Sequence, residues 1–129
     1  MVSKWETIMA YILIVDDDDV IRETLFELLS TNYKCETAAT AEEALAKLEN
    51  TNVTVLLTDI TLPGLSGRDL LAHVQQRLPQ TAVIVISGIS DEDQAQMLMT
   101  MGAFDYLLKP FRLEAVEASV KRALESRGE

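Results

Sequence analysis

Cysteine and long uninterrupted hydrophobic segments are both scarce in this 129-residue sequence. Cys35 is the only cysteine, which excludes a disulfide within the chain and fits a reducing compartment. We interpret it as a small buried apolar residue. No apolar run approaches the roughly 18 residues that a membrane-spanning helix needs, and the N-terminus lacks the basic-then-apolar pattern of a signal peptide. These absences predict a cytoplasmic protein without a membrane span.

Basic residues are scarce relative to acidic ones. The chain has 11 Lys and Arg against 21 Asp and Glu, which gives a formal net charge of −10. Such a balance argues against this chain binding nucleic-acid phosphates itself. Internal repeats, low-complexity tracts and linkers are absent as well. A chain of 129 residues buries roughly two thirds of its unfolded surface, so we expect a single domain.

What the sequence does have is an apolar run that recurs and ends each time on a polar residue. Val53–Leu57 is rich in β-branched residues and leads into Thr58 and Asp59, which is typical of a buried strand. A carboxylate beside an apolar core is costly unless something pairs with it. Three further runs have the same form: Tyr11–Val15 before Asp16 and Asp17, Ala82–Ile86 before Ser87, and Phe104–Leu108 before Lys109.

Helical patterns separate these runs. A short strand is expected at Lys34–Thr37, and Thr40 with Glu43 forms a capping-box pattern in which each side chain satisfies an N–H at the other's backbone. Gly102 stands where a left-handed helix cap is favoured. The expected helices are Val20–Ser30, Thr40–Leu48, Arg68–Arg77 before Pro79, Asp91–Met101, and a last helix with Leu113, Val116, Val120 and Leu124 on one face.

These elements form a (βα)5 pattern, which predicts an α/β fold with a doubly wound five-stranded parallel sheet. Crossovers between parallel strands are right-handed, and strands this apolar need helices on both faces of the sheet. Ligands bind beyond the carboxyl ends of the strands in such a sheet. We therefore expect one edge to gather three acids, a hydroxyl and an ammonium: Asp16, Asp17, Asp59, Ser87 and Lys109.

This set of side chains predicts phosphoryl chemistry. Three carboxylates at one edge raise one another's pKa, and a hard divalent cation resolves their repulsion. Mg2+ takes about six oxygen ligands, usually few carboxylates together with waters and a phosphate. Asp16, Asp17 and Asp59 leave such a shell open for a phosphoryl group, whose other oxygens Lys109 and Ser87 would contact. The set suits in-line attack of a carboxylate on phosphorus, which gives an aspartyl phosphate.

Four segments carry a resemblance to a known family. They are Ile12–Asp18, Leu57–Gly67, Val85–Gly88 and Gly102–Phe111. Through them the sequence resembles the receiver domain of bacterial two-component response regulators, of the kind found in chemotaxis regulators. The resemblance spans residues 11–124 and implies a flavodoxin-like sheet with the strand order 2-1-3-4-5.

The resemblance implies a phosphoacceptor and a magnesium site. Asp59 matches the phosphoacceptor of the family. Asp16 and Asp17 match the acidic pair that holds Mg2+, with Asp59 itself and the backbone carbonyl of Thr61 as further ligands.

The resemblance also implies a switch. Ser87 matches the switch hydroxyl, at a position where threonine is more frequent, and Gly88 keeps the approach to the phosphate open. Lys109 matches the lysine of the family, and its peptide bond to Pro110 would be cis. Tyr106 matches the aromatic residue that swings inward when the hydroxyl moves to the phosphate.

Partners follow from the same resemblance. A sensor histidine kinase or a phosphotransfer protein would present a phosphohistidine to Asp59, and the chain would catalyse only its own phosphorylation and dephosphorylation. Output would pass to a downstream protein or effector domain, or to a phosphorylation-dependent homodimer, through the fourth helix, the fifth strand and the fifth helix. Met97, Met99 and Met101 suit either an adaptable partner surface or a partly covered helix flank. We interpret His73 as a surface residue.

The expected domain boundaries are a leader at residues 1–10, to which the resemblance assigns no role, and a receiver domain at residues 11–127. One helix is expected after Lys109 and no effector domain. The sequence therefore fits either a stand-alone receiver or a part of a longer regulator.

Three other interpretations share some of these residues. A haloacid-dehalogenase-like phosphotransferase would use Asp16 as its nucleophile, and Asp16, Asp18 and Val20 fit its motif. However, no acidic strand end follows Lys109, and the chain has no room for a cap domain. A calcium loop starting at Asp16 fails because Ile21 stands where a glycine turn is needed. A flavodoxin-type site fails because the acids after the first strand would repel the flavin phosphate.

Overall fold

The computed structural model describes residues 10–88 and 91–127. Its five strands are all parallel and form one sheet in the order β2-β1-β3-β4-β5. The strands are β1 (Tyr11–Val15), β2 (Lys34–Ala38), β3 (Val55–Asp59), β4 (Ala82–Ser87) and β5 (Asp105–Leu108). The predicted fold class and strand order are confirmed.

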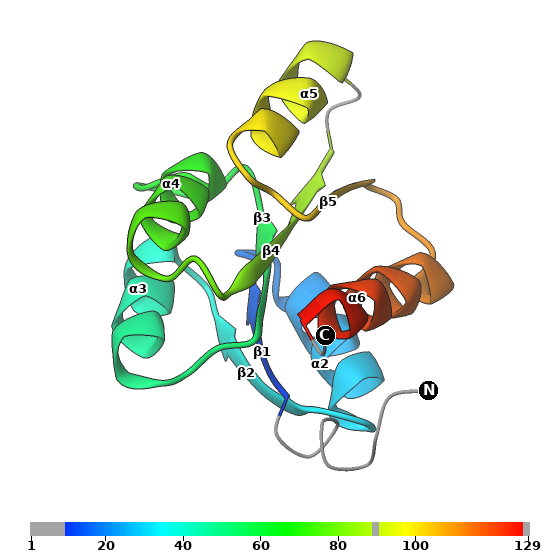
Figure 1. The fold of residues 1–129 in the computed structure, drawn as a ribbon. Helices are drawn as coiled ribbons and strands as arrows, with labels where there is room; N and C mark the ends of the chain where they lie inside the picture. Colours follow the sequence, from blue (N-terminus) through cyan, green and yellow to red (C-terminus); the bar gives the residue numbers. More distant parts are fainter. Residues whose placement is uncertain (1–9, 89–90, 128–129) are drawn as a thin grey trace.

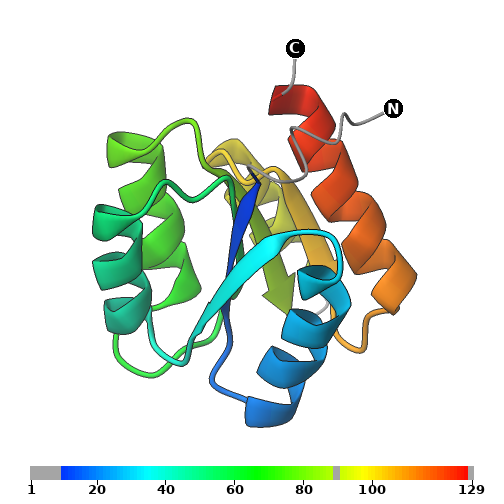
Figure 2. The same cartoon turned by 90° about the horizontal axis from the view of Figure 1, so that it is seen from below.

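Helices cover both faces of this sheet (Figures 1 and 2). In the described part of the chain they are α2 (Asp19–Ser30), α3 (Ala41–Asn50), α4 (Gly67–Arg77), α5 (Glu92–Thr100) and α6 (Leu113–Arg127). Figure 2 shows α3 and α4 on one side of the sheet and α2 and α6 on the other. The helix α5 packs against the edge strand β5.

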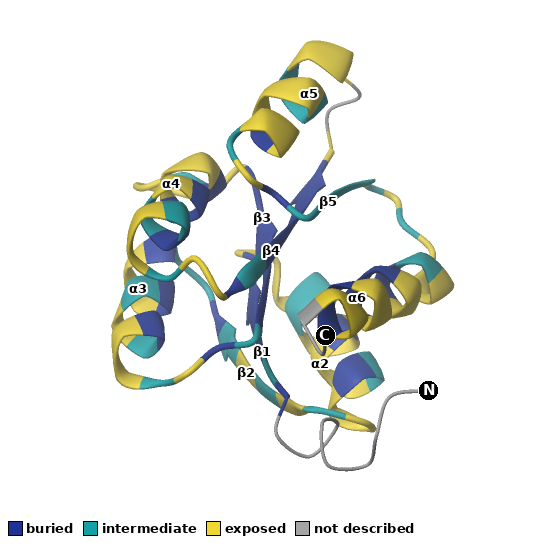
Figure 3. Ribbon diagram, in the orientation of Figure 1, coloured by how far each residue is buried: buried dark blue, intermediate teal, exposed yellow. Residues whose placement is uncertain are grey.

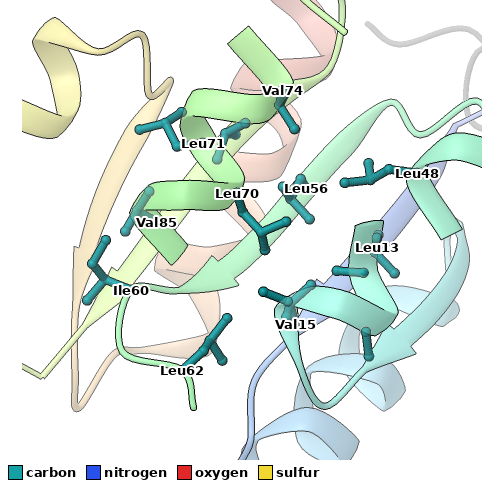
Figure 4. Packing of buried hydrophobic residues seen from close by; sticks show 14 of the residues in the cluster. Leu13, Val15, Leu48, Leu56, Ile60, Leu62, Leu70, Leu71, Val74 and Val85 are labelled. Carbon is teal, nitrogen blue, oxygen red and sulfur yellow. The ribbon is translucent and has the colours of Figure 1, made fainter. Parts of the chain in front are cut away.

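The central strands are buried on both faces, which explains their nearly continuous apolar sequence. Successive side chains point to opposite faces of a strand. In β1, Leu13 and Val15 accordingly pack towards α3 and α4, whereas Ile12 and Ile14 pack towards α2 and α6. Figure 4 shows the first of these layers, in which Leu56 of β3 lies among side chains of α3 and α4.

The edge strand β5 differs from the three central strands. The sequence pattern predicted another apolar strand beginning at Phe104. The strand β5 begins at Asp105 instead, and its residues are partly buried or exposed. Figure 3 shows this contrast between β5 and the buried strands β3 and β4. An edge strand has a neighbour on one side only, and at this edge α5 and α6 leave part of it in contact with solvent.

The helix ends agree with the sequence signals, with one exception. Thr40 caps α3 by accepting a hydrogen bond from the N–H of Glu43 at 3.1 Å. The capping-box pattern predicted that the Glu43 carboxylate would accept from the N–H of Thr40. It accepts instead from the N–H of Ala39, at 2.8 Å. The difference arises because the extended backbone before the helix presents the N–H one residue earlier. Gly102 has a φ of +105°, as a left-handed cap requires.

Two further expectations concern peripheral positions. Ala10 is buried, and its carbonyl accepts from the N–H of Lys34 at 3.2 Å, whereas the rest of the expected leader lies outside the described residues. Cys35 lies partly buried on β2, and burial raises the pKa of its thiol to about 11. No helix within residues 10–88 and 91–127 is long and apolar enough to cross a membrane.

Candidate functional site

Three carboxylates converge where β1 and β3 end. Asp16 and Asp17 follow β1, and Asp59 is the last residue of β3. The two strands are neighbours, with Val15 opposite Thr58 in the register, so their carboxyl ends reach the same edge of the sheet. One carboxylate oxygen from each of the three residues lies within 4.8 Å of the others. The convergence predicted from the strand ends is therefore present.

Lys109 reaches the same carboxylates from beyond β5. Its Nζ lies 3.1 Å from Oδ2 of Asp16 and 3.0 Å from Oδ2 of Asp59. The backbone N–H of Lys109 donates to the carbonyl of Ser87 at 2.8 Å, which continues the pairing of β4 with β5. The peptide bond between Lys109 and Pro110 is cis, as the resemblance implied.

Burial and charge set the titration of these groups. Asp16 is 1% exposed, and burial raises the pKa of its carboxyl although the N–H of Asp18 and the ammonium of Lys109 lower it. Burial alone would lower the pKa of Lys109, but hydrogen bonds and charges from Asp59 and Asp16 outweigh it, and the net pKa is raised. Lys109 therefore stays charged, and neutralises part of the repulsion between two buried carboxylates.

The loop after β3 holds Asp59 in place. The N–H of Thr61 donates to Oδ1 of Asp59 at 3.1 Å, so each carboxylate oxygen has a donor. Gly67, the first residue of α4, packs directly on the end of the strand: a Cβ at Gly67 would lie 2.2 Å from the carbonyl oxygen of Asp59. A side chain is thus excluded there. Gly67 ends one of the segments that carry the resemblance, but this role was not predicted, because only the packing of α4 against the end of β3 shows it.

The donor set fits a hard divalent cation. Three carboxylates against one ammonium leave a formal excess of two negative charges at this edge. Asp17 is exposed, whereas Asp16 and Asp59 are buried, so a cation would be reached by solvent from one side. Carboxylate oxygens are the ligands that Mg2+ prefers, usually with several waters retained.

A second polar cluster lies next to the carboxylates, between β4, β5 and α5. Ser87 ends β4 and is fully buried, and Tyr106 of β5 is half-buried. The side-chain nitrogen of Gln94, on the first turn of α5, donates to Oγ of Ser87 and to the hydroxyl of Tyr106, each at 3.3 Å. Ser87 and Tyr106 were predicted as a pair. Gln94 was missed, because no pattern distinguishes it from other polar residues on the helix.

The remaining residues after β1 serve the start of α2. Oδ1 of Asp18 accepts from the N–H groups of Val20 and Ile21, which makes it the N-cap of the helix. Asp19 is exposed and pairs with Arg22. Asp18, which also fits the haloacid-dehalogenase-like motif, therefore has a structural role as the cap of α2.

The other predicted positions lie around this edge or away from it. A Cβ at Gly88 would meet nothing within 4 Å, in line with an open approach. His73 is half-buried on α4 and was expected at the surface. Met97 and Met99 on α5 are exposed, whereas Met101, the C-cap residue after α5, packs against the core layer of α3 and α4.

The sequence matches the family model of the response regulator receiver domain over residues 12–121. The chain therefore belongs to the family of response regulator receiver domains. Among curated proteins, it is 41% identical over 112 residues to the DNA-binding transcriptional regulator NtrC of Salmonella typhimurium, covering 86% of this chain and 24% of that protein. It is 40% identical over 117 residues to the response regulator protein PilR of Pseudomonas aeruginosa, covering 89% of this chain and 26% of that protein.

Solved structures agree. A response regulator receiver domain protein from Clostridium thermocellum matches with a TM-score of 0.86 and 33% identity, over 93% of this chain and 98% of that one. The BeF3-activated DrrB receiver domain matches with a TM-score of 0.85 and 33% identity, over 92% of this chain and 99% of that one. The chain thus matches whole receiver domains but spans about a quarter of the length of the curated relatives.

Proposed function

We propose that this chain is a phosphorylatable receiver in which Asp59 accepts a phosphoryl group. The observation that carries the proposal is the position of the Lys109 ammonium, 3.0 Å from the Asp59 carboxylate, with Asp16 and Asp17 alongside. A structural ion pair also places a lysine beside a carboxylate, but it does not require three acids at one edge of the sheet. Membership of the receiver family supports the same assignment.

Asp16, Asp17 and Asp59 would hold Mg2+, with the backbone carbonyl of Thr61 as a further ligand. When bound, Mg2+ neutralises charge on the phosphoryl oxygens and on the carboxylates around them. The residues of this chain supply the rest of the charge balance. The Lys109 ammonium is already shared between Asp16 and Asp59 and can move its contact to a phosphoryl oxygen without crossing the site.

The transfer itself is an in-line displacement at phosphorus. One carboxylate oxygen of Asp59 attacks, a P–O bond forms, and the P–N bond to the phosphohistidine of a kinase or phosphotransfer protein breaks. The electron pair of that bond returns to the ring nitrogen that carried the phosphoryl group, and because the other ring nitrogen is protonated, the imidazole leaves as the neutral ring. The hydrogen bonds from the N–H of Thr61 to Oδ1 and from Lys109 to Oδ2 orient the carboxylate for this attack.

The switch follows from the neighbouring cluster. Ser87 ends the strand beside Asp59, and its hydroxyl would move to a phosphoryl oxygen, with Tyr106 following. Shifting a conformational population from 1:99 to 99:1 takes ~5.5 kcal/mol, and a few charge-assisted hydrogen bonds of roughly 1.5–3 kcal/mol each can supply that.

The output surface would be the face formed by α5, β5 and α6. Met97, Met99 and Leu108 are exposed there, and Met99 is 45% exposed. Flexible methionine side chains suit a surface that adapts to a partner. The partners would be a sensor histidine kinase or phosphotransfer protein and a downstream protein or effector domain, with a phosphorylation-dependent homodimer as a further form of output, all in the cytoplasm.

Intact-protein mass tests this proposal. The wild type, Asp59→Asn and Asp16→Asn are each incubated with acetyl phosphate and Mg2+. We expect one phosphoryl group on the wild type and none on Asp59→Asn. Labelling that persists in Asp59→Asn and disappears in Asp16→Asn would contradict the proposal and favour Asp16 as the nucleophile.

A further inference from the structure

Gln94 joins the two switch side chains to helix α5. Its side-chain nitrogen carries two hydrogens, and the two oxygens within reach are Oγ of Ser87 and the hydroxyl of Tyr106, each at 3.3 Å. The three residues come from β4, β5 and α5, so one amide group connects three elements. A primary amide is suited to this task because it can donate to both oxygens at once.

The backbone of Gln94 is also fixed. Asp91 caps α5 by accepting from the N–H groups of Asp93 and Gln94. The amide of Gln94 therefore extends from a capped first turn, and any displacement of the two hydroxyls acts on the start of the helix. A residue in a frayed turn would absorb such a displacement locally.

The other attachment of α5 lies one turn further on. Leu98 is fully buried in the layer formed with α3 and α4. Residues four apart share a face of a helix, so Gln94 and Leu98 lie one above the other. The helix thus has an apolar anchor at Leu98 and a polar anchor at Gln94. A change at the polar anchor alters the position of α5 around the apolar one.

From this geometry we propose that Gln94 is the positioning residue through which Ser87 and Tyr106 are coupled to α5. The inference rests on the proposed function, because it needs a phosphoryl group at Asp59 to move Ser87. When Ser87 moves towards Asp59, the distance between its Oγ and the Gln94 nitrogen changes. The hydrogen bond from the same nitrogen to the hydroxyl of Tyr106 changes as a result. The first turn of α5 shifts with the amide, and the exposed methionines shift with the helix.

The test uses methionine methyl and backbone amide NMR signals of the full chain, with and without Mg2+ and beryllofluoride. Three proteins are compared: the wild type, Gln94→Leu, and the matched control Gln96→Leu, which changes an exposed glutamine on the same helix. In the wild type and in the control, the Thr61 amide and the methyl groups of Met97 and Met99 should all shift.

In Gln94→Leu, we expect the Thr61 amide to shift as in the wild type, while the shifts of the two methyl groups fall at least twofold. Wild-type methyl shifts in Gln94→Leu would overturn the inference. Absence of any shift at Thr61 in the wild type would overturn the proposed function instead, so the two failures are distinguishable. A general loss of helix stability is excluded by equal thermal midpoints of the two leucine variants.

A second variant covers the case in which Gln94→Leu perturbs α5 by itself. Tyr106→Phe removes only the hydroxyl that Gln94 contacts. If the amide acts through that hydroxyl, the effects of Gln94→Leu and Tyr106→Phe on the methyl shifts are less than additive in the double variant. Fully additive effects would mean that the two residues act independently, which contradicts the inference.

Discussion

Helices α4 and α5 lie on the same side of the sheet but are held very differently. The helix α4 buries Gly67, Leu70, Leu71 and Val74 against the sheet, whereas α5 buries Leu98. Figure 3 shows that α5 is largely exposed. The strands that they contact differ in the same way. The strand β3, whose end meets α4 at Gly67, is buried throughout, whereas the residues of β5 are partly buried or exposed.

This difference separates the two tasks proposed for the domain. The acceptor carboxylate lies on the well-packed part, where Gly67 presses against the backbone of Asp59. The reporting surface lies on the part with few buried apolar contacts, where local rearrangement needs little free energy. On the proposed function, we therefore expect a ligand at Asp59 to shift α5 without disturbing the geometry that holds the ligand.

The largest effect is expected from a methyl group placed between α4 and Asp59. In Gly67→Ala the new Cβ would lie 2.2 Å from the carbonyl oxygen of Asp59 and 2.7 Å from the Cα of Ile60. Both are backbone atoms, which cannot move aside as a flexible side chain can. We expect the free energy of unfolding to fall by more than the ~1–3 kcal/mol typical of overpacked cores. Gly88→Ala is the matched control, because its Cβ meets nothing within 4 Å. Equal urea midpoints for the two variants would contradict this account.

The next effect distinguishes the two helices directly. Leu71→Ala and Leu98→Ala each remove a fully buried leucine from the same layer. We expect Leu71→Ala to lower global stability by roughly 2–5 kcal/mol. Leu98→Ala should lower it less and should mainly speed hydrogen exchange of the α5 amides, because α5 can detach alone. Denaturant unfolding measures the loss of global stability in each variant, and hydrogen exchange measures the opening of α5. A larger loss of global stability in Leu98→Ala than in Leu71→Ala would refute the comparison.

A smaller effect, an increase in stability, is expected from replacing the buried Asp16 by a neutral residue. Burial raises the pKa of Asp16, so its proton is bound more tightly in the folded chain, and stability falls as pH rises from the ordinary value of 3.8 through the raised pKa. Above that range the charged carboxylate is a net cost. Asp16→Asn should therefore raise the thermal midpoint near pH 7 in the absence of Mg2+, by a few degrees per kcal/mol gained. It should also abolish the response of the Thr61 amide to Mg2+. A lowered midpoint would contradict this prediction.

The smallest effect concerns Lys109 in alkali. Its raised pKa means that its contribution to stability is fully present below the ordinary value of 10.5 and is lost as pH rises through the raised pKa. Cys35, Tyr11 and Tyr33 also have raised pKa values, so they add to the fall. Lys109→Arg keeps the charge in this range. The difference between the two proteins, measured by thermal midpoint between pH 9 and about pH 11.5, isolates Lys109 and should widen only above 10.5.

The sequence predicted the acceptor half of the molecule well. Parallel strands must end at the same edge, so a carboxylate after each of two apolar runs was enough to bring Asp16 and Asp59 together. The reporting half was harder to predict. The half-burial of β5 depends on its place at the sheet edge. The role of Gln94 depends on the rotation of α5 about its axis, and that of Gly67 on how closely α4 approaches β3. None of these three has a local sequence signal.

The central claim is that a phosphoryl group at Asp59 repacks α5 and β5 while α4 and β3 stay fixed. Backbone amide shifts of the wild type, recorded with Mg2+ and with and without beryllofluoride, test it most directly, with Asp59→Asn as the control. We expect large shifts in α5 and β5, small shifts along α4 beyond its first turn, and none of these changes in Asp59→Asn. Shifts of equal size in α4 and α5, or shifts confined to the neighbours of Asp59, would contradict the claim.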